Sequence, residues 1–411
     1  MKYLSVFTIV FLSTALSFAR VEVLFHPYDP TLEKISEVFQ SADHRIDIAM
    51  YNMETSTKSP IIAALALPKM QKRIQSGELQ IRLIFEGYGT PEENATNMKR
   101  LEALGIDVRY LNASKKIHHK FAVVDADSEN PKLISGSANW SLSSRANYNE
   151  NIFFIEDEKE ISKQFQNEFE LLWTFSQEYG ETLNLSPLQF KKIKGDSSLL
   201  GHFNSENYIF SKEGVTLKRD QQDTLTSLLS EKIQSAQKEI FIATTRIHLE
   251  DVKEALVEAM SRKVKVWIVV SMDEYMSSHS STRDLEAAGA QVRIKYYNLK
   301  KTEYLQRQMH HKYMIIDSEL VLSGSFNWSP SSEKSHIENV IELSGADHPE
   351  ALQRFLMDFK RLWTMNRDQY KQTLDKVSSS DDMKCGLVPM VLYRGEINAL
   401  LKAFKGKSCH N

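Results

Sequence analysis

The sequence predicts an α/β protein made of two tandem α/β/α sandwich domains, which are related by a pseudo-two-fold axis and share one site. Three observations support this prediction. The chain of 411 residues is long enough for two domains, it contains one internal repeat, and each repeat alternates amphipathic helical segments with short apolar strands. In each half we expect a mixed, largely parallel sheet between helices.

The two halves correspond element by element. The alternating strand at Arg45–Tyr51 corresponds to Glu239–Thr245, and each follows an amphipathic helical segment. Further along, Leu101–Arg109 corresponds to Leu285–Arg293, and a glycine inside each segment marks the end of a helix before the next strand. These matches indicate a duplicated unit and not two unrelated domains.

Each half ends in a helical segment whose aromatic residues are spaced four apart. They are Phe165, Phe169 and Trp173 in the first half and Phe355, Phe359 and Trp363 in the second half. Residues at this spacing lie on one face of a helix, so we predict that they pack in the core and do not bind a ligand.

The chain divides into a leader, two domains, a linker and a tail. The leader begins with Lys2, continues through an apolar run and ends at Ala19, with small residues at the positions that a signal peptidase reads. We therefore predict cleavage after Ala19 and an exported protein, periplasmic or secreted; a buried first helix or an uncleaved anchor is the alternative. The predicted segments are a signal peptide at residues 1–19, domain 1 at 20–175, a linker at 176–205, domain 2 at 206–377 and a C-terminal tail at 378–411.

The composition is that of a globular protein. The formal net charge of -3 gives no overall field that would attract a polyanion, so any binding to nucleic acid or to a membrane must be local. No internal segment is apolar for long enough to span a membrane. The 2 cysteines, Cys385 and Cys409, both lie in the tail, where they either form one disulfide or remain free thiols.

One set of polar residues recurs in both halves with nearly the same spacing. In the first half the set consists of His118, Lys120, Asp125, Ser137, Asn139 and Glu150. In the second half it consists of His310, Lys312, Asp317, Ser325, Asn327 and Glu338. Packing alone does not retain polar residues in halves that have otherwise diverged, so the set indicates chemistry.

The residue types in this set suit a phosphate group. A histidine and a lysine two positions apart on a strand point to the same face, which presents an imidazole beside an ammonium group. The serine and asparagine that follow a glycine add neutral donors for phosphate oxygens. Two such half-sites facing each other across the repeat axis would place two histidines, two lysines and two asparagines around one phosphorus atom. The pattern therefore predicts a phosphodiesterase.

Each motif histidine is followed by a second histidine, His119 or His311, which raises the question of a metal site. Neighbouring residues of a strand point to opposite faces, so His119 and His311 should point away from the first histidine of each pair. A lysine beside each motif histidine would also repel a cation. We therefore expect an enzyme that needs neither a metal nor another cofactor.

The repeated motif resembles that of the phospholipase D superfamily, whose signature is His-x-Lys-x4-Asp followed by Gly-Ser-x-Asn, twice per active site. The resemblance extends from Val21 to about Trp363. It looks closest to the small bacterial nuclease and mitochondrial cardiolipin hydrolase branch, because both copies continue Asn-Trp-Ser and residues 149–151 read Asn-Glu-Asn. Members of that branch carry one motif and dimerise, so the covalent duplication implies that this chain can be complete as a monomer.

The resemblance implies a division of roles between the two histidines. His118 would attack phosphorus and form a phosphohistidine, while His310 would protonate the leaving oxygen and then activate water. The reverse order is the alternative. The motif lysines and asparagines, assisted by the two serines, would bind the phosphoryl oxygens as charge develops.

The resemblance also assigns the four acidic residues of the two motifs. Glu150 and Glu338 would each hydrogen-bond the far nitrogen of a histidine and fix its tautomer. Asp125 and Asp317 belong to the catalytic motif by sequence, with a structural role expected for them.

The sequence departs from the family pattern at one place. The family often has Phe-Ser-Pro, whereas this chain has Phe25-His26-Pro27 in the first half and Phe210-Ser211 in the second half. Only part of the family pattern is therefore present in each half.

The motif recognises a phosphate and not its substituents, so the predicted substrate is either a phospholipid or a nucleic acid. A phospholipase needs an apolar mouth, and a nuclease needs a basic groove with aromatic stacking platforms. Basic and tyrosine residues that slightly favour a polyanion precede the two motifs: Lys115, Lys116, Lys295, Lys300, Lys301, Arg307, Tyr110, Tyr296, Tyr297 and Tyr304. The alternatives are a strict DNA or RNA endonuclease without lipid activity and a non-catalytic phosphate-binding module.

Overall fold

The computed structural model describes residues 20–87, 90–111, 115–178, 198–211, 214–220, 222–278, 280–300 and 307–410. The predicted signal peptide at residues 1–19 lies outside these ranges, as does the greater part of the predicted linker, residues 179–197. Within the described ranges, no helix is both long and apolar enough to cross a bilayer.

The two halves each form one large sheet. The strands of the first sheet are β1 (Arg20–His26), β2 (Arg45–Met50), β3 (Gln80–Phe85), β4 (Asp107–Leu111), β6 (Lys120–Val124), β7 (Lys132–Gly136), β8 (Glu150–Glu156) and β9 (Ser176–Gln177). The strands of the second sheet are β10 (Leu199–Phe203), β13 (Glu239–Thr244), β14 (Lys265–Ser271), β15 (Gln291–Asn298), β16 (Lys312–Ile316), β17 (Leu320–Gly324), β19 (Asn339–Ser344) and β21 (Gly386–Leu392). Six further strands form short pairs outside the sheets: β5 (Lys116–Ile117), β11 (Tyr208–Ser211), β12 (Gly214–Leu217), β18 (His336–Ile337), β20 (Asp382–Lys384) and β22 (Ser408–His410).

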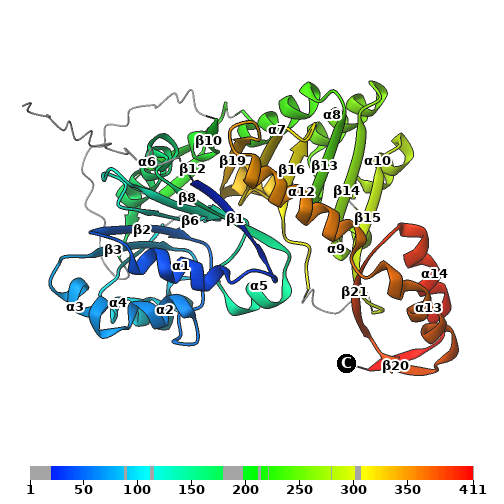
Figure 1. The fold of residues 1–411 in the computed structure, drawn as a ribbon, viewed down its shortest axis with the longest axis horizontal. Coiled ribbons are helices and arrows are strands. Elements are labelled where there is room, and N and C mark those ends of the chain that lie inside the picture. The colour runs from blue at the N-terminus through cyan, green and yellow to red at the C-terminus, as the bar shows by residue number, and fades with distance from the viewer. Residues whose placement is uncertain are drawn as a thin grey trace, which may run out of the picture.

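The two sheets have the same topology (Figure 1). The strand order is β1-β8-β7-β6-β2-β3-β4-β9 in the first and β10-β19-β17-β16-β13-β14-β15-β21 in the second. The predicted α/β class with two tandem domains is therefore confirmed.

The expectation of largely parallel sheets is wrong. In the first sheet only β2–β3 and β3–β4 pair parallel, and the other neighbours pair antiparallel. The second sheet repeats this pattern, with parallel pairs at β13–β14 and β14–β15. The reason is that crossover helices connect only the early strands of each half. From β6 to β7, and from β16 to β17, the chain simply reverses, which gives an antiparallel pair.

Helices cover both faces of each sheet. In the first half they are α1 (Thr31–Gln40), α2 (Pro60–Leu65), α3 (Pro68–Gln75), α4 (Pro91–Glu102), α5 (Leu142–Asn147) and α6 (Lys159–Phe175). In the second half they are α7 (Thr224–Ser235), α8 (Glu250–Ser261), α9 (Met272–Met276), α10 (Thr282–Ala288), α11 (Pro330–Ser335) and α12 (Pro349–Thr364), followed by α13 (Tyr370–Ser379) and α14 (Arg394–Phe404). Two short 3-10 helices are η1 (Ser205–Asn207) and η2 (Arg367–Gln369).

The central core lies between the two sheets, where α6 and α12 pack. Phe165 of α6 lies 5.1 Å from the ring of Phe121 in its own half and 4.9 Å from the ring of Phe203 in the other half. Phe355 of α12 lies 5.4 Å from Phe25 of the first half. The predicted core role of these helix aromatics is confirmed. Because each of the two helices packs against both halves, the domains share one apolar core.

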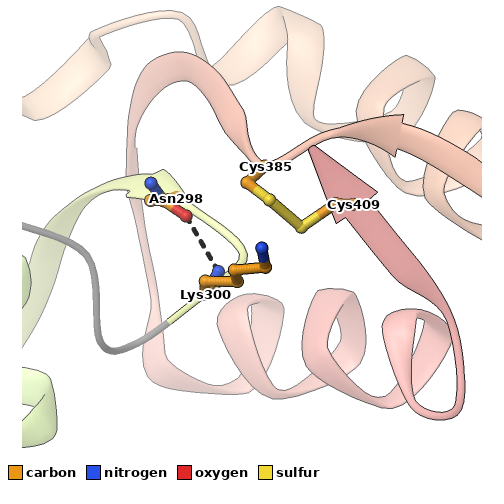
Figure 2. The surroundings of a disulfide bond; sticks show 4 residues. All are labelled: Asn298, Lys300, Cys385 and Cys409. Carbon is orange, nitrogen blue, oxygen red and sulfur yellow. Dashed lines mark hydrogen bonds between the residues drawn. A yellow bond between two sulfur atoms is a disulfide. The ribbon is translucent and has the colours of Figure 1, made fainter. Parts of the chain in front are cut away.

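Residues after 378, predicted to form a separate tail, take part in the second domain. β21 pairs antiparallel with β15, at the position that β9 occupies in the first sheet. Cys385 and Cys409 form a disulfide (Figure 2). The Cys385 carbonyl accepts the N–H of Leu299 at 2.9 Å. The tail thus holds the end of β15, from which the chain continues toward the second motif.

Candidate active site

Each motif histidine lies just before the strand that carries its lysine, and the opposite half holds its backbone. The N–H of His118 donates to the carbonyl of Ile337 at 2.9 Å, and the N–H of His310 donates to the carbonyl of Asn149 at 3.0 Å. A parallel pairing of β5 with β18 extends the first of these contacts. The two halves are therefore joined by backbone hydrogen bonds where both motifs enter the site.

Each motif histidine is paired with the glutamate of the other half. His118 Nδ1 lies 2.9 Å from the carboxylate of Glu338, and His310 Nδ1 contacts Glu150 Oε1. Both glutamates are fully buried. We expected from the sequence that the glutamates bind the histidines, but the exchange between halves was not predicted. It means that neither motif histidine is paired with the motif glutamate of its own half.

Burial keeps both imidazoles neutral. It lowers the pKa of His118 to about 3 and that of His310 to about 4, although the paired glutamate acts in the opposite direction. Burial would raise the pKa of Glu150 and Glu338, but the paired imidazoles outweigh it and hold both pKa values below the usual range. A proton on Nδ1 facing an ionised carboxylate leaves a free lone pair on Nε2, which is the form that a nucleophile or a base requires.

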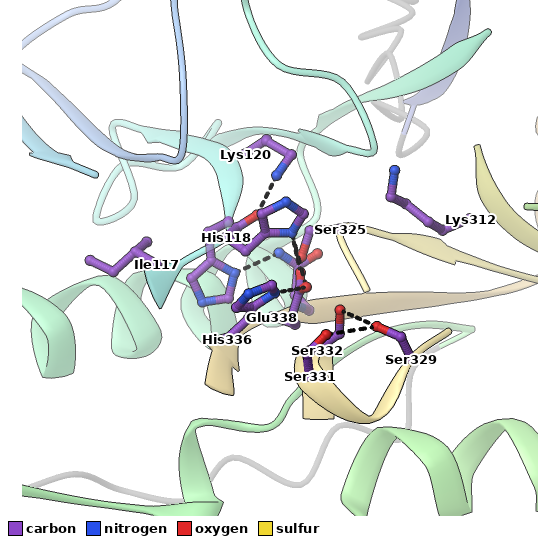
Figure 3. Close-up of polar contacts among 12 residues, drawn as sticks. Ile117, His118, Lys120, Lys312, Ser325, Ser329, Ser331, Ser332, His336 and Glu338 are labelled. Carbon is purple, nitrogen blue, oxygen red and sulfur yellow. Dashed lines mark hydrogen bonds and ion pairs between the residues drawn. The ribbon is translucent and has the colours of Figure 1, made fainter. Parts of the chain in front are cut away.

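The two motif lysines are buried close to the histidines. Lys120 Nζ donates to the His118 carbonyl at 2.6 Å, and Lys312 Nζ donates to the His310 carbonyl at 2.5 Å. Figure 3 shows Lys120 beside His118, with Lys312 across the site. Burial lowers the pKa of Lys120 to about 8 and that of Lys312 to about 7. An anion bound between them would favour their charged form, so the site suits a phosphate.

The Gly-Ser-x-Asn segments hold the strands that carry the glutamates. Ser137 Oγ accepts the N–H of Asn151, and Ser325 Oγ accepts the N–H of Asn339, both at 3.0 Å. At the preceding glycines a Cβ atom would lie 2.2 Å from the carbonyl oxygen of Asn151 or Asn339, so only glycine permits this approach. The serine hydroxyls, expected to assist phosphate binding, are thus engaged with the backbone.

The two motif asparagines differ in burial. Asn139 is 5% exposed, and its Oδ1 has no hydrogen-bond partner within the described part of the chain. Because the oxygen and nitrogen of a carboxamide exchange places when the group flips, this end of Asn139 can present a donor to a ligand. Asn327 is partly exposed at the equivalent position.

The two motif aspartates lie at the far ends of the motif strands. Asp125 accepts the backbone N–H groups of residues 43–45, and Asp317 accepts those of residues 237–239, all at 2.7–2.9 Å. The whole of β6 or β16, about 16 Å of extended chain, separates each aspartate from the site. Their inclusion among the catalytic residues is therefore corrected: each carboxylate fixes the start of β2 or β13.

The second histidine of each pair points away from the site, in agreement with strand alternation. His119 Nε2 lies 2.9 Å from Glu168 Oε1, and His311 Nε2 lies 3.2 Å from Asp358 Oδ2. Both are fully buried. These two histidines therefore do not join the motif histidines around one metal ion.

His336, which shares Glu338 with His118, was not predicted from the sequence. The rings of His336 and His118 stack with centroids 5.3 Å apart, and His336 Nδ1 lies 3.6 Å from Glu338 Oε1. These three residues are the one group among the described residues with the spacing of a metal-ligand set. Lys120, whose charge contributes to the lowered pKa of His118, opposes a cation there. The equivalent residue in the first half is Tyr148, so the repeat itself gave no signal for His336.

The residue of the second half that is equivalent to His26 differs from the one expected from the sequence. His26 ends β1 opposite Glu150, and the equivalent position after β10 is Asn204, whose Oδ1 accepts the N–H of Glu338 at 2.8 Å. Residues 210–211 instead lie in the separate β11–β12 pair. The structural equivalent of Phe25-His26 is therefore Phe-Asn at 203–204, which the family pattern does not reveal.

Part of the predicted basic and aromatic cluster is buried. Lys295, Tyr296 and Tyr297 are 3%, 0% and 5% exposed. They pack in the second domain and cannot offer a surface for base stacking or phosphate contacts, so the prediction is wrong for these three residues. Lys301 and Tyr304 lie outside the described ranges.

Comparison with known proteins agrees with the geometry of the site. Residues 35–173 and 229–363 match the model of a family described as "Cardiolipin synthase, PLD-like domain". A mitochondrial cardiolipin hydrolase of Chlamydomonas reinhardtii is 30% identical over 131 residues, which are 32% of this chain and 54% of that protein. A phospholipase D of Rickettsia bellii is 25% identical over 159 residues, 39% of this chain and 74% of that protein. The chain spans about half or less of the length of the first cardiolipin hydrolases that it matches.

Solved structures show the same fold over most of the chain. The phosphatidylserine synthase of Haemophilus influenzae Rd KW20 matches with a TM-score of 0.56 at 11% identity, over 82% of this chain and 86% of that chain. The polyphosphate kinase of Porphyromonas gingivalis matches with a TM-score of 0.53 at 15% identity, over 82% of this chain and 46% of that chain. At such identities the likeness concerns the fold alone. The two family segments cover more than half of the sequence and contain both motif histidines, and the chain therefore belongs to the phospholipase D superfamily.

Proposed function

We propose that this protein is a metal-independent phosphodiesterase that works through a covalent phosphohistidine and is complete as a monomer. The observation that carries the proposal is the exchange of glutamates, because His118 is oriented by Glu338 and His310 by Glu150. This exchange brings both motifs to one site. The two buried lysines there supply positive charge for one phosphate.

The reaction proceeds in two displacements. In the first, the Nε2 lone pair of His118 attacks phosphorus, the bond from phosphorus to the leaving oxygen breaks, and that oxygen takes a proton from His310 Nε2. In the second, His310 takes a proton from water, the water oxygen attacks phosphorus, and the phosphorus–nitrogen bond breaks to restore His118. Burial lowers the pKa of His310 to about 4 in the free protein, and the charge of a bound phosphate favours the protonated form needed for the first step.

The proposed substrate is a phosphodiester of a phospholipid or of a nucleic acid. The relatives named cardiolipin hydrolase and phospholipase D support a lipid. The burial of Lys295 and its neighbouring tyrosines removes part of the support for a polyanion groove. A strict DNA or RNA endonuclease is the second candidate, favoured by basic residues before the two motifs that stay exposed, among them Lys116 and Arg307. The two complete histidine–glutamate pairs argue against a non-catalytic phosphate-binding module.

The test compares two substrates in the presence of EDTA. Purified protein is incubated in parallel with single-stranded DNA and with mixed phospholipid vesicles, beside the variants His118→Ala and His310→Ala. His348→Ala is the matched control, because His348 binds Ser198 outside the site. We expect cleavage of one substrate class and a loss of about 10³-fold or more in both motif variants only. Activity that disappears with EDTA, or that survives in either motif variant, would contradict the proposal.

The order of the histidines is tested by trapping the intermediate. A phosphohistidine is stable in base and labile in acid, which distinguishes it from a phosphoserine. We expect a covalent adduct in His310→Ala treated with a p-nitrophenyl phosphodiester, whose leaving group needs no proton, and none in His118→Ala. The opposite result would reverse the two roles.

We also propose that the protein is exported. The disulfide between Cys385 and Cys409 supports this, because such bonds persist in oxidising compartments. Cell fractionation with N-terminal sequencing tests it. A cytoplasmic protein that retains residues 1–19 would contradict the proposal.

A further inference from the structure

Glu150 is contacted by three donors, of which only one belongs to the motif. His310 Nδ1 contacts Oε1, whereas the Ser144 hydroxyl contacts Oε2 and His26 Nδ1 lies 3.5 Å from the same Oε2. His26 and Glu150 are 0% exposed. Both oxygens of this carboxylate are therefore engaged, away from bulk solvent.

His26 is itself held on its other side. Its Nε2 lies 2.5 Å from Oγ1 of Thr31, the buried first residue of α1. With the Thr31 hydroxyl as donor, the ring proton of His26 is on Nδ1, the nitrogen that faces Glu150. A continuous chain of polar contacts thus runs from His310 through Glu150 and His26 to helix α1.

The described residues of the second half form no such arrangement. Asn204, at the position equivalent to His26, directs its amide to the backbone carbonyls of residues 332, 333 and 336 and not to the Glu338 carboxylate. The hydroxyl of Ser332, equivalent to that of Ser144, contacts another serine. Glu338 instead has a second imidazole in His336, whose side chain is 23% exposed. The chain of buried contacts is therefore specific to the carboxylate behind His310.

We infer that His26 is a positioning residue for the acid/base step: acting through Glu150, it holds His310 in the orientation that delivers a proton to the leaving oxygen. This inference rests on the proposed function and adds a residue to it. The titratable groups facing Glu150 are His310, His26, His311 and the two motif lysines. Of these, His26 and His310 contact the two different carboxylate oxygens.

The physical role of His26 is to prevent rotation of the carboxylate. With Oε2 held by His26 and Ser144, Oε1 stays directed at His310 Nδ1 and stabilises the imidazolium when His310 carries its proton. No proton passes through His26. The proton of the first step moves only from His310 Nε2 to the leaving oxygen.

The test uses His26→Asn, which copies the residue of the second half, on two substrates. One is whichever phosphodiester the comparison of DNA with phospholipid vesicles shows to be cleaved, whose alkoxide leaving group needs a proton. The other is a p-nitrophenyl phosphodiester, whose leaving group does not. We expect kcat on the alkoxide substrate to fall about tenfold or more, with little change in KM. This loss is smaller than the loss expected when the acid/base group itself is removed. The p-nitrophenol burst should be nearly unchanged, and the pH–rate profile of the alkoxide substrate should shift.

Controls separate this effect from a general loss of structure. Thr31→Val removes the hydroxyl that contacts His26 and should also impair cleavage of the alkoxide substrate more than that of the p-nitrophenyl substrate, to a smaller extent. This variant keeps the test decisive if His26→Asn does not fold. His348→Asn should change neither substrate. An equal loss on both substrates with an unmoved pH profile would overturn the inference and leave the proposed function intact. A wild-type protein that cleaves no phosphodiester would instead refute the proposed function.

Discussion

The two halves of the site carry the same motif residues in different surroundings. Glu150 is enclosed by buried hydroxyl and imidazole groups, whereas Glu338 contacts the partly exposed His336 in addition to His118. The backbone contacts across the halves and the close approach at each motif glycine are the same. The duplication has thus retained what one phosphate needs from both sides, while the support of each carboxylate has diverged. This divergence fits two histidines with different tasks.

The largest effects should come from the glutamates, where the two tasks can be separated. Glu150→Gln and Glu338→Gln should each lower kcat by about 10²–10⁴-fold, because a carboxamide neither fixes the histidine tautomer nor stabilises its charged form. With a p-nitrophenyl phosphodiester, Glu338→Gln should form no covalent intermediate, whereas Glu150→Gln should accumulate it in rapid-quench experiments. Glu342→Gln, which alters a carboxylate bound to Lys232, is the control. Identical behaviour of the two motif variants would contradict the division of tasks.

The lysines should show a smaller difference that depends on pH. Lys120→Met and Lys312→Met should each lower kcat by about 10²–10³-fold, as the loss of one donor to the developing charge does. Sulfate, whose charge is constant near neutrality, should bind wild type more weakly as pH rises, because burial lowers the pKa of Lys312 to about 7 and that of Lys120 to about 8. Deprotonation removes the charge that attracts the anion. Sulfate affinity measured by calorimetry across this pH range should show one fewer titration step in each variant than in wild type. A sulfate affinity of wild type that does not depend on pH would refute this account.

The outer edges of the two sheets differ in the disulfide. The first sheet ends in the two-residue strand β9, whereas β21 lies between Cys385 and Cys409, whose disulfide spans a sequence separation of 24. Replacing both cysteines by serine should lower the free energy of unfolding by about 3 kcal/mol in the chain-entropy model, with kcat retained below the melting transition. Thermal denaturation with and without reductant measures this. A variant as stable as wild type would show that β21 needs no such bond.

The smallest effects should come from the aspartates, where the two halves are alike. Asp125→Asn and Asp317→Asn should each lower the free energy of unfolding by about 1–3 kcal/mol and leave kcat nearly unchanged. Both weaken contacts with backbone N–H groups outside the site, and Asp125 also contacts His44 Nδ1 at 3.2 Å. Partial burial would raise the pKa of Asp317, but the backbone N–H groups of residues 237–239 lower it overall.

A carboxyl group whose pKa is lower in the folded protein than in the unfolded chain stabilises the fold at pH values above its unfolded-state pKa. This stabilisation is lost as the pH falls through the folded-state pKa. Urea unfolding of wild type should therefore show this loss below about pH 4, and Asp317→Asn should show less of it. A loss of activity as large as that of the motif histidines would return the aspartates to the catalytic set.

What could be predicted from the sequence was local. The spacing of His118 and Lys120 and the opposite direction of His119 follow from strand alternation, which holds within one segment. The pairing of His118 with Glu338 depends on how two separate domains dock, and no local pattern encodes that.

The errors have physical causes of the same kind. Lys295 and Tyr296 were interpreted as surface residues by type, but β15 is covered by helices on one side and by the tail at its edge. The equivalent of His26 was missed because Asn204 follows a strand with little similarity to β1, and only the sheet register aligns them.

The crossed pairs have a consequence for the integrity of the enzyme. If the domains move apart, both histidines lose their carboxylates at the same moment, since each carboxylate belongs to the other domain. Denaturant should therefore inactivate both histidines together, and because the domains share one apolar core, this loss should accompany unfolding. For the same reason, loss of either half removes from the other both the carboxylate that orients its histidine and the opposing motif.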